Sequence, residues 1–278
     1  MARSDYVINL YAYTLNRTAQ EAMAELADHG FEAFELMMYP GHLWMPDMDA
    51  GARAALRKFI ASRNLHIQSV NQPNIDINIA AAAPEMREHS IRMMARMVEC
   101  AGEFGARQVL IGPGKVNPLM PMPRDQLIGH FYRALDQLVP LAQKAGTQVL
   151  VENMPFAFLP DAEGLLTVVE GYGSDDVGIL YDLANGAFIK EDIRAALKRC
   201  GDRLKLVHLS DTGTKVYKHD PVGHGTMDFG ALIEDLAAIG WTERPVLEII
   251  GVSEQPSAEI LDSIRRLEEV GWANRFAA

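Results

Sequence analysis

Short apolar runs rich in β-forming residues alternate with longer amphipathic segments along the whole chain, with a repeat of about thirty residues. Most of these runs are apolar without strict alternation, as expected for parallel strands that are covered on both faces. Eight runs can be distinguished, at residues 6–13, 33–38, 66–71, 108–111, 148–153, 178–183, 204–209 and 246–250. Eight strands that alternate with helices predict an α/β fold, a closed (β/α)8 TIM barrel.

The segments between the runs have the spacing of amphipathic helices, most clearly between residues 91 and 101. Thr18 and Asp228 stand where helix-capping residues are expected. A doubly wound sheet is the alternative fold, but it would have a glycine-rich turn after its first strand, which residues 11–16 lack. No linker and no change in composition divides the chain, so we expect residues 1–278 to form one domain.

Charge and composition limit the kinds of partner. A formal net charge of −11 argues against nucleic acid or an anionic membrane surface, because both require a cationic face. The chain has no apolar stretch of membrane-spanning length and no pattern of a secretion signal at its start. We therefore expect a soluble, cytoplasmic protein. Cys100 and Cys200 form no CxxC unit and are expected to be free thiols.

The last four predicted strands each carry one acidic or imidazole group near the C-terminal end of an apolar run. These groups are Glu152 in LVENM, Asp182 in LYDLAN, His208 in LVHLS and Glu248 in LEII. The C-terminal ends of the strands form the active-site face of a barrel, so these side chains are expected to converge. Converging carboxylates repel one another and lose hydration, and a divalent cation removes both penalties. Three carboxylates and one imidazole favour Mn²⁺, with Mg²⁺, Co²⁺ or Zn²⁺ as alternatives.

Each of these residues also has a purely structural interpretation. A lone glutamate in a strand is often paired with a Lys or Arg of a neighbouring strand, and a lone core histidine is often simply hydrogen-bonded. Four such groups at equivalent positions of four successive strand–helix units are better explained by one shared metal ion.

The chain resembles the xylose isomerase-like barrel superfamily in the motifs VENMP, YDLAN, VHLSDT with HDPVGHGTMDF, VLEII, GFEAFEL and GARQVLIGPG. That superfamily contains sugar isomerases and epimerases, among them ketose 3-epimerases, hydroxypyruvate isomerase and inosose dehydratase, and more distantly endonuclease IV. The resemblance implies that Glu152, Asp182, His208 and Glu248 bind the metal. It also implies that the two glutamates act as acid and base on opposite faces of a sugar carbon.

The resemblance also bears on the substrate. Asn185 stands where ketose 3-epimerases have a substrate-binding histidine, and Phe158 lies about where they have a further glutamate, which argues against a free ketohexose. His219 matches a loop position from which family members contact the ligand or the metal. Gln72 and Gly112 replace histidines that bind zinc in endonuclease IV, so a nuclease is not expected, and Gln72 becomes a candidate contact to substrate.

Other polar residues near the strand ends have weaker assignments. Glu35 is predicted to orient a metal ligand or a base, with a strand-to-strand ion pair as the alternative. Trp44 is predicted to form an apolar wall over the pocket, although its loop could equally be a subunit contact in a dimer or tetramer. Lys115 could meet an anionic substrate or face solvent. His219 and His224 are candidates for a second proton-transfer role.

These features predict a divalent-metal-dependent isomerase or epimerase that acts on a small sugar, keto-sugar or polyol. It would remove a proton next to a carbonyl and form an enediolate stabilised by the metal. Loss of a β-hydroxyl from the same enediolate would make the protein a dehydratase or lyase instead. A barrel that binds a sugar without catalysis is the alternative from another class. No phosphate-binding turn is evident after the seventh or eighth strand, so an unphosphorylated substrate is expected.

Overall fold

The computed structural model describes residues 5–74 and 76–276, and its eight parallel strands form a closed barrel, as predicted. The strands follow one another in chain order, and β1 closes the ring by pairing with β8. Their bounds are β1 (Val7–Asn9), β2 (Ala33–Met37), β3 (His66–Asn71), β4 (Gln108–Ile111), β5 (Gln148–Glu152), β6 (Val177–Asp182), β7 (Leu204–Leu209) and β8 (Val246–Leu247).

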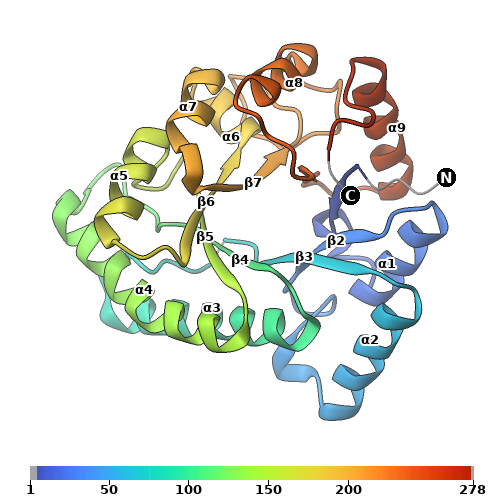
Figure 1. The fold of residues 1–278 in the computed structure, drawn as a ribbon. Helices are drawn as coiled ribbons and strands as arrows, with labels where there is room; N and C mark the ends of the chain where they lie inside the picture. The colour runs from blue at the N-terminus through green and yellow to red at the C-terminus, as the bar shows by residue number, and fades with distance from the viewer. Residues whose placement is uncertain (1–4, 75, 277–278) are drawn as a thin grey trace.

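Helices surround the strands on the outside of the barrel (Figure 1). The α-helices are α1 (Ala19–Asp28), α2 (Ala50–Ser62), α3 (Pro84–Phe104), α4 (Arg124–Ala145), α5 (Ala162–Tyr172), α6 (Leu183–Phe188), α7 (Ile193–Cys200), α8 (Phe229–Ala238) and α9 (Pro256–Glu269). Three short 3₁₀ helices are η1 (Tyr11–Tyr13), η2 (Met45–Asp47) and η3 (Gly201–Arg203). In the described part of the chain, no helix combines the length and the apolar character needed to cross a membrane.

The helix starts follow from local side-chain chemistry. Thr18 caps α1 in a capping box, in which its side chain accepts from Glu21 N while the Glu21 carboxylate accepts from Thr18 N. Asp228 caps α8 by accepting from Ala231 N at 3.0 Å. Both predicted caps are therefore present. Each fixes the point at which an irregular loop at the C-terminal ends of the strands becomes a helix.

Two strands, β1 and β8, are at least three residues shorter than the apolar runs that predicted them. The first run leaves the sheet after Asn9, because Asn9 Oδ1 accepts a hydrogen bond from Tyr11 N and the chain turns into η1. The last run leaves it after Leu247, and Ile250 N then donates to His219 O at 2.9 Å. Both departures occur at the C-terminal ends of strands, and both bring loop residues towards the barrel mouth.

The barrel interior has an apolar layer below a polar layer. The apolar layer is one cluster of buried side chains from seven strands: Val7, Ala33, Leu110, Leu150, Leu180, Leu206 and Val246. Side chains two residues apart on a strand point to the same face, so the next inward position lies one layer closer to the C-terminal end. On six of these strands that position is polar and buried: Asn9, Glu35, Glu152, Asp182, His208 and Glu248.

Candidate active site

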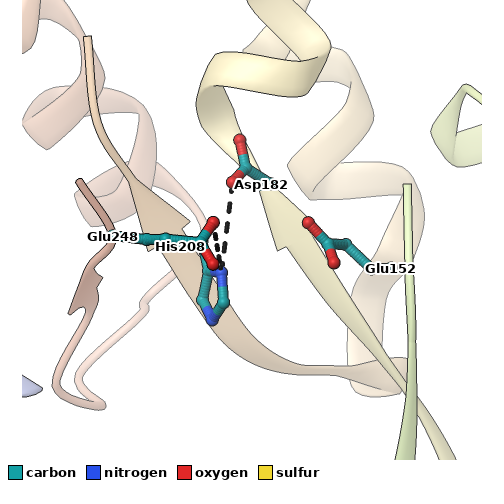
Figure 2. Close-up of side chains that lie close together, drawn as sticks. All are labelled: Glu152, Asp182, His208 and Glu248. Atoms are coloured by element: carbon teal, nitrogen blue, oxygen red, sulfur yellow. Dashed lines mark ion pairs between the residues drawn. The ribbon is translucent and has the colours of Figure 1, made fainter. Parts of the chain in front are cut away.

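Side chains from β5, β6 and β7 and from the residue directly after β8 converge at the C-terminal end of the barrel (Figure 2). Glu152, Asp182, His208 and Glu248 each offer one ligand atom, and these atoms lie within 4.8 Å of one another. Two atoms bound to one ion lie at most roughly 4.0–4.4 Å apart, twice an ordinary metal–ligand distance. A contraction of a few tenths of an ångström would therefore let the cluster hold one divalent ion. The four residues predicted as ligands are brought together.

His208 lies between two carboxylates that contact opposite sides of its ring. Its Nδ1 lies 3.2 Å from Glu248 Oε2 and 4.0 Å from Asp182 Oδ2. Its Nε2 lies 3.1 Å from Glu35 Oε2. With the Nε2 proton donated to Glu35, Nδ1 faces the cluster with its lone pair available. This is the arrangement in which a carboxylate orients a metal-binding histidine.

Glu35 is itself held by other barrel side chains and is completely buried. Its Oε1 accepts from Asn9 Nδ2 at 2.6 Å and from Asn71 Nδ2 at 3.3 Å, and its Oε2 accepts from Ser69 Oγ at 2.5 Å. These donors compensate for the lost hydration of the carboxylate. The contact with His208 is consistent with the predicted orienting role, and when His208 is protonated the same contact is the alternative strand-to-strand ion pair.

The protonation of the cluster is set by burial and by its own charges. Burial, and next to it the charge of Glu248, hold the pKa of Glu152 well above its usual range. Burial also raises the pKa of Asp182. Burial alone would lower the pKa of His208, but the carboxylates of Glu35 and Glu248 outweigh it and raise that pKa well above the ordinary value. His208 in turn lowers the pKa of Glu248 against the opposing effect of burial.

The residues of the cluster fit a divalent metal ion. Asp182 Oδ2 is buried and has no hydrogen-bond partner in the part of the chain that the structure describes, so a cation would complete its coordination. The other oxygen, Oδ1, accepts from Asn185 N at 2.7 Å at the start of α6, which fixes the carboxylate. An oxygen-rich set with one imidazole suits the harder divalent ions.

A chain of hydrogen bonds connects Glu152 to the loop between β7 and α8. Asn185 Nδ2 donates to Glu152 Oε1 at 3.0 Å, and Asn185 Oδ1 accepts from Tyr217 OH at 2.6 Å. Tyr217 OH also lies 2.9 Å from His219 Nε2, and because the phenol proton is used by Asn185, His219 Nε2–H must be the donor. His219 Nδ1 then faces Ser210 Oγ at 2.9 Å. Burial raises the pKa of Tyr217, so the phenol keeps its proton.

Asp211 fixes the shape of this β7–α8 loop. Its carboxylate accepts backbone hydrogen bonds from Thr212 at 2.9 Å, Gly223 at 2.8 Å and Met227 at 3.1 Å. Its backbone pairs with that of Asp220, with both N···O distances 2.8 Å. Asp211 is thus a structural residue that holds Tyr217 and His219 over the cluster.

A cavity of about 390 Å³ opens above the cluster. Glu152 and Glu248 form part of its lining, so both carboxylates are within reach of a bound molecule. Tyr11 also lines it, and burial together with Glu248 raises the pKa of that phenol to about 12. A ligand of this size would displace water from the cluster.

The sequence model of the xylose isomerase-like TIM barrel family matches residues 23–270. The chain belongs to this family. Among curated proteins it is 23% identical over 276 residues to an L-ribulose 3-epimerase of Mesorhizobium japonicum, a match that covers 97% of this chain and 87% of the relative.

Solved structures share the xylose isomerase-like fold. A D-tagatose 3-epimerase-like protein superposes with a TM-score of 0.81 at 20% identity, over 96% of each chain. An IolI protein described with a zinc atom superposes with a TM-score of 0.78 at 17% identity, over 99% of this chain and all of the other. At these identities the likeness establishes the fold.

Of the predicted substrate-binding residues of this xylose isomerase-like barrel, Gln72 and His219 line the cavity. Lys115 also lines it. Asn185 is fully buried and touches Glu152 and Tyr217, so it supports the site from behind. Glu35 lies below the cluster, against His208.

Three further residues that the sequence singled out also lie outside the cavity. Trp44 lines a separate groove beside α1 and α2, because its loop is held to α1 by Ala19 N donating to His42 O at 3.0 Å. Its predicted place as a wall over the pocket is therefore wrong. His224 is exposed and is not part of the cavity lining, and Phe158 packs edge-on against Phe131, with ring centroids 6.2 Å apart.

Three residues that line the cavity are not among the site residues predicted from the sequence: Tyr217 and Phe156, which the sequence did not single out, and Tyr11, which it offered only as a polar residue near the end of the first strand. Tyr217 and Phe156 lie in irregular loops, where no periodicity marks a residue's direction. Tyr11 was assigned to a strand, although it lies in η1. The sequence signal for this is Asn9, because an asparagine side chain can accept a hydrogen bond from the backbone N–H two residues further on, and such a bond ends β1 before Tyr11.

Proposed function

We propose that this protein is a divalent-metal-dependent sugar epimerase or isomerase that moves a proton at a carbon next to a carbonyl. The observation that carries the proposal is the pair of glutamates in the cavity. Glu152 ends β5 and Glu248 follows β8, with β6 and β7 between them, so the two carboxylates approach a bound molecule from different sides. The likeness to an L-ribulose 3-epimerase and to a D-tagatose 3-epimerase-like protein supports the same class.

Glu152, Asp182, His208 and Glu248 would hold the metal. A bound divalent ion would supply positive charge beside the substrate carbonyl oxygen, where negative charge develops when the neighbouring carbon loses its proton. We propose Mn²⁺, on the oxygen-rich ligand set. The zinc atom described in the IolI structure makes Zn²⁺ the main alternative.

The two glutamates divide the proton transfer between them. One carboxylate takes the proton from the carbon, and the electron pair of the broken C–H bond moves into the carbonyl to give an enediolate. The other glutamate returns a proton to the opposite face, which inverts that carbon. Return of the proton to the neighbouring carbon would give isomerisation, and loss of a β-hydroxyl would give a dehydratase.

The series of hydrogen bonds that runs through Tyr217 supports this chemistry from one side of the cavity. Asn185 holds Glu152 Oε1, and Tyr217 holds Asn185 and His219 in fixed orientations. His219 Nδ1 lies 3.5 Å from Glu248 Oε2, so the chain reaches both glutamates. Fixed acid and base groups need no reorganisation during the reaction.

The test is solvent deuterium exchange into both epimers of a ketose with the Mn²⁺-loaded protein. Each epimer presents its C–H to one glutamate, so Glu152→Gln should stop exchange from one epimer and Glu248→Gln should stop it from the other. Metal content measured on each variant controls for loss of the ion. Wild-type exchange by both variants would rule out these residues as the bases.

Elemental analysis separates this proposal from a barrel that only binds sugar. A catalytic barrel should retain or take up about one divalent ion per chain. Protein that contains no divalent metal and takes up none from excess Mn²⁺ would favour the binding protein.

A further inference from the structure

The cavity above the cluster has a polar floor and an apolar wall. The wall is formed by the segment after β5, which contributes Met154, Pro155, Phe156 and Ala157, and by Ile250 on the opposite side. A bare sugar carries hydroxyl groups around its ring and C–H groups only on its faces, and a hydroxyl buried without a partner loses free energy. The floor can satisfy hydroxyls, but these side chains cannot.

The wall is a built part of the fold. Val116 N donates to Phe156 O, and Phe158 N donates to Gly114 O at 3.1 Å, so the loops after β4 and β5 are joined. Met154 Sδ accepts from Asn74 Nδ2 at 3.2 Å. The apolar side chains are thus held at the cavity by backbone and side-chain bonds.

Phe156 is the outermost member of an aromatic group at the cavity mouth. Its ring lies 5.5 Å from that of Tyr217 and 6.1 Å from that of Phe188, at steep interplanar angles. Yet 61% of Phe156 is exposed. An exposed phenylalanine that lines a cavity, braced by other rings, offers a face on which a flat apolar group can lie.

The apolar surface continues beyond the main cavity. A second cavity of about 180 Å³ lies beside it and is lined by Ala12, Leu15, Tyr39 and Val252 among others. Tyr11 and Ile250 line both cavities and form the partition between them. The apolar lining thus continues past Ile250, on the side of the cavity that lies away from β5 and Phe156.

Two lysines are the observation that would favour an anionic substrate instead. Lys115 and Lys218 both line the cavity. Lys218 lies at the rim with 56% of its side chain exposed, and its Nζ is 3.5 Å from Asp220 Oδ2. Lys218 is paired and solvated and contributes little to binding an anion. Lys115 is then the one remaining lysine among the described lining residues, against the five apolar side chains of the wall, so the apolar wall is the stronger indication of substrate class.

We propose that the substrate is a keto-sugar that carries an aromatic group, such as an aryl glycoside with a keto group on its sugar ring, with the sugar on the carboxylate floor and the aromatic group against Phe156. This inference rests on the proposed function, which requires the sugar, and not the aromatic group, to face Glu152 and Glu248. It identifies Phe156 as a residue that determines specificity, and it predicts that unsubstituted sugars are poor ligands.

Calorimetric binding to the Mn²⁺-loaded protein tests the inference without reference to turnover. The ligands are 4-nitrophenyl β-D-glucoside and methyl β-D-glucoside, which differ only in the substituent. We expect the aryl ligand to bind roughly tenfold more tightly. Phe156→Ala should abolish this preference and leave binding of the methyl ligand unchanged. Val216→Ala is the matched control, because Val216 is also 61% exposed in a neighbouring loop but does not line the cavity.

The outcomes separate this inference from the proposed reaction. Equal affinity for the two glucosides, no measurable binding of either, or a preference that survives Phe156→Ala would overturn the aromatic subsite. So would tighter binding of a phosphorylated ketose than of the aryl glucoside, if that binding is lost in Lys115→Ala or Lys218→Ala. Deuterium exchange into free ketoses would still stand in each of these cases. Conversely, a Phe156-dependent preference without exchange into either a free ketose or an aryl-substituted keto-sugar would retain the subsite and reject the reaction.

Discussion

Replacing Glu35 by glutamine tests whether the carboxylate below His208 prepares that residue to bind a metal. Glu35 Oε2 lies 3.1 Å from His208 Nε2 and accepts from Ser69 Oγ at 2.5 Å, while Oε1 accepts from Asn9 Nδ2 at 2.6 Å. Glutamine has the same shape but presents an NH₂ group in place of one of these oxygens. At least one donor then faces another donor, and the negative charge that favours the Nε2 proton is lost.

The size of the effect follows from these contacts. Loss of a carboxylate that orients a metal-binding histidine lowers metal affinity by about 10–100-fold, which is roughly 1.4–2.8 kcal/mol. Metal in excess stabilises the folded state by RT ln(1 + [L]/Kd), so the same free energy is lost from the metal-dependent stabilisation. At about 2–4 °C per kcal/mol for a chain of this size, the rise in Tm that Mn²⁺ produces should shrink by roughly 3–11 °C.

Calorimetric titration with Mn²⁺ and thermal melts with and without the ion measure both quantities. Glu32→Gln is the matched control, because Glu32 precedes the same strand at the opposite end of the barrel and pairs with Arg244 at 3.3 Å. Wild-type Mn²⁺ affinity in Glu35→Gln would refute the reasoning. An equal loss in Glu32→Gln would show that the effect is general destabilisation.

Three further predictions concern the same face of the barrel. The pKa values of Glu152 and His208 are raised in the folded protein, so the metal-free folded state holds protons that the unfolded chain releases, and the free energy of unfolding falls as pH rises. Metal binding requires removal of these protons. Melts should therefore show a larger Mn²⁺-dependent rise in Tm at about pH 8 than at about pH 6. Tyr217→Phe leaves Asn185 Oδ1 without its donor, and should lower kcat by roughly tenfold with Mn²⁺ affinity unchanged; an unchanged kcat would contradict this. Gly225→Ala places a Cβ 2.4 Å from Thr212 O and should destabilise the protein by about 1–3 kcal/mol in denaturant titrations, whereas Gly213→Ala, with no atom within 4 Å, should not.

The polar layer of the barrel could be predicted because it depends on strand geometry. Glu152, Asp182 and His208 each follow an apolar inward residue by two positions, and a period of two is a property of any strand. The order of the strands then places consecutive strand ends side by side. No knowledge of loop conformation is needed for either step.

The loop residues could not be predicted in the same way. Tyr217 reaches the cavity because Asp211 gathers three backbone N–H groups of its loop, an arrangement that depends on side-chain bonding between distant positions. The predicted position of Trp44 over the pocket is wrong because the sequence of a long loop after a strand does not indicate whether an aromatic side chain faces the pocket or the helices. The backbone bond from α1 to His42 decides that direction, and no local pattern encodes it.

The charges of the cluster give the strongest physical reason for a bound cation. Glu35, Asp182 and Glu248 form their ion-pair contacts in the described part of the chain with His208 and His219. A protonated His208 can offset one of these charges, and to do so it must hold the proton that blocks Nδ1. Burial raises the pKa values of Asp182 and Glu152, so both carboxyl groups favour their protonated forms when no cation is bound. A divalent ion would replace those protons with two positive charges at one point, and the same residues would then be its ligands.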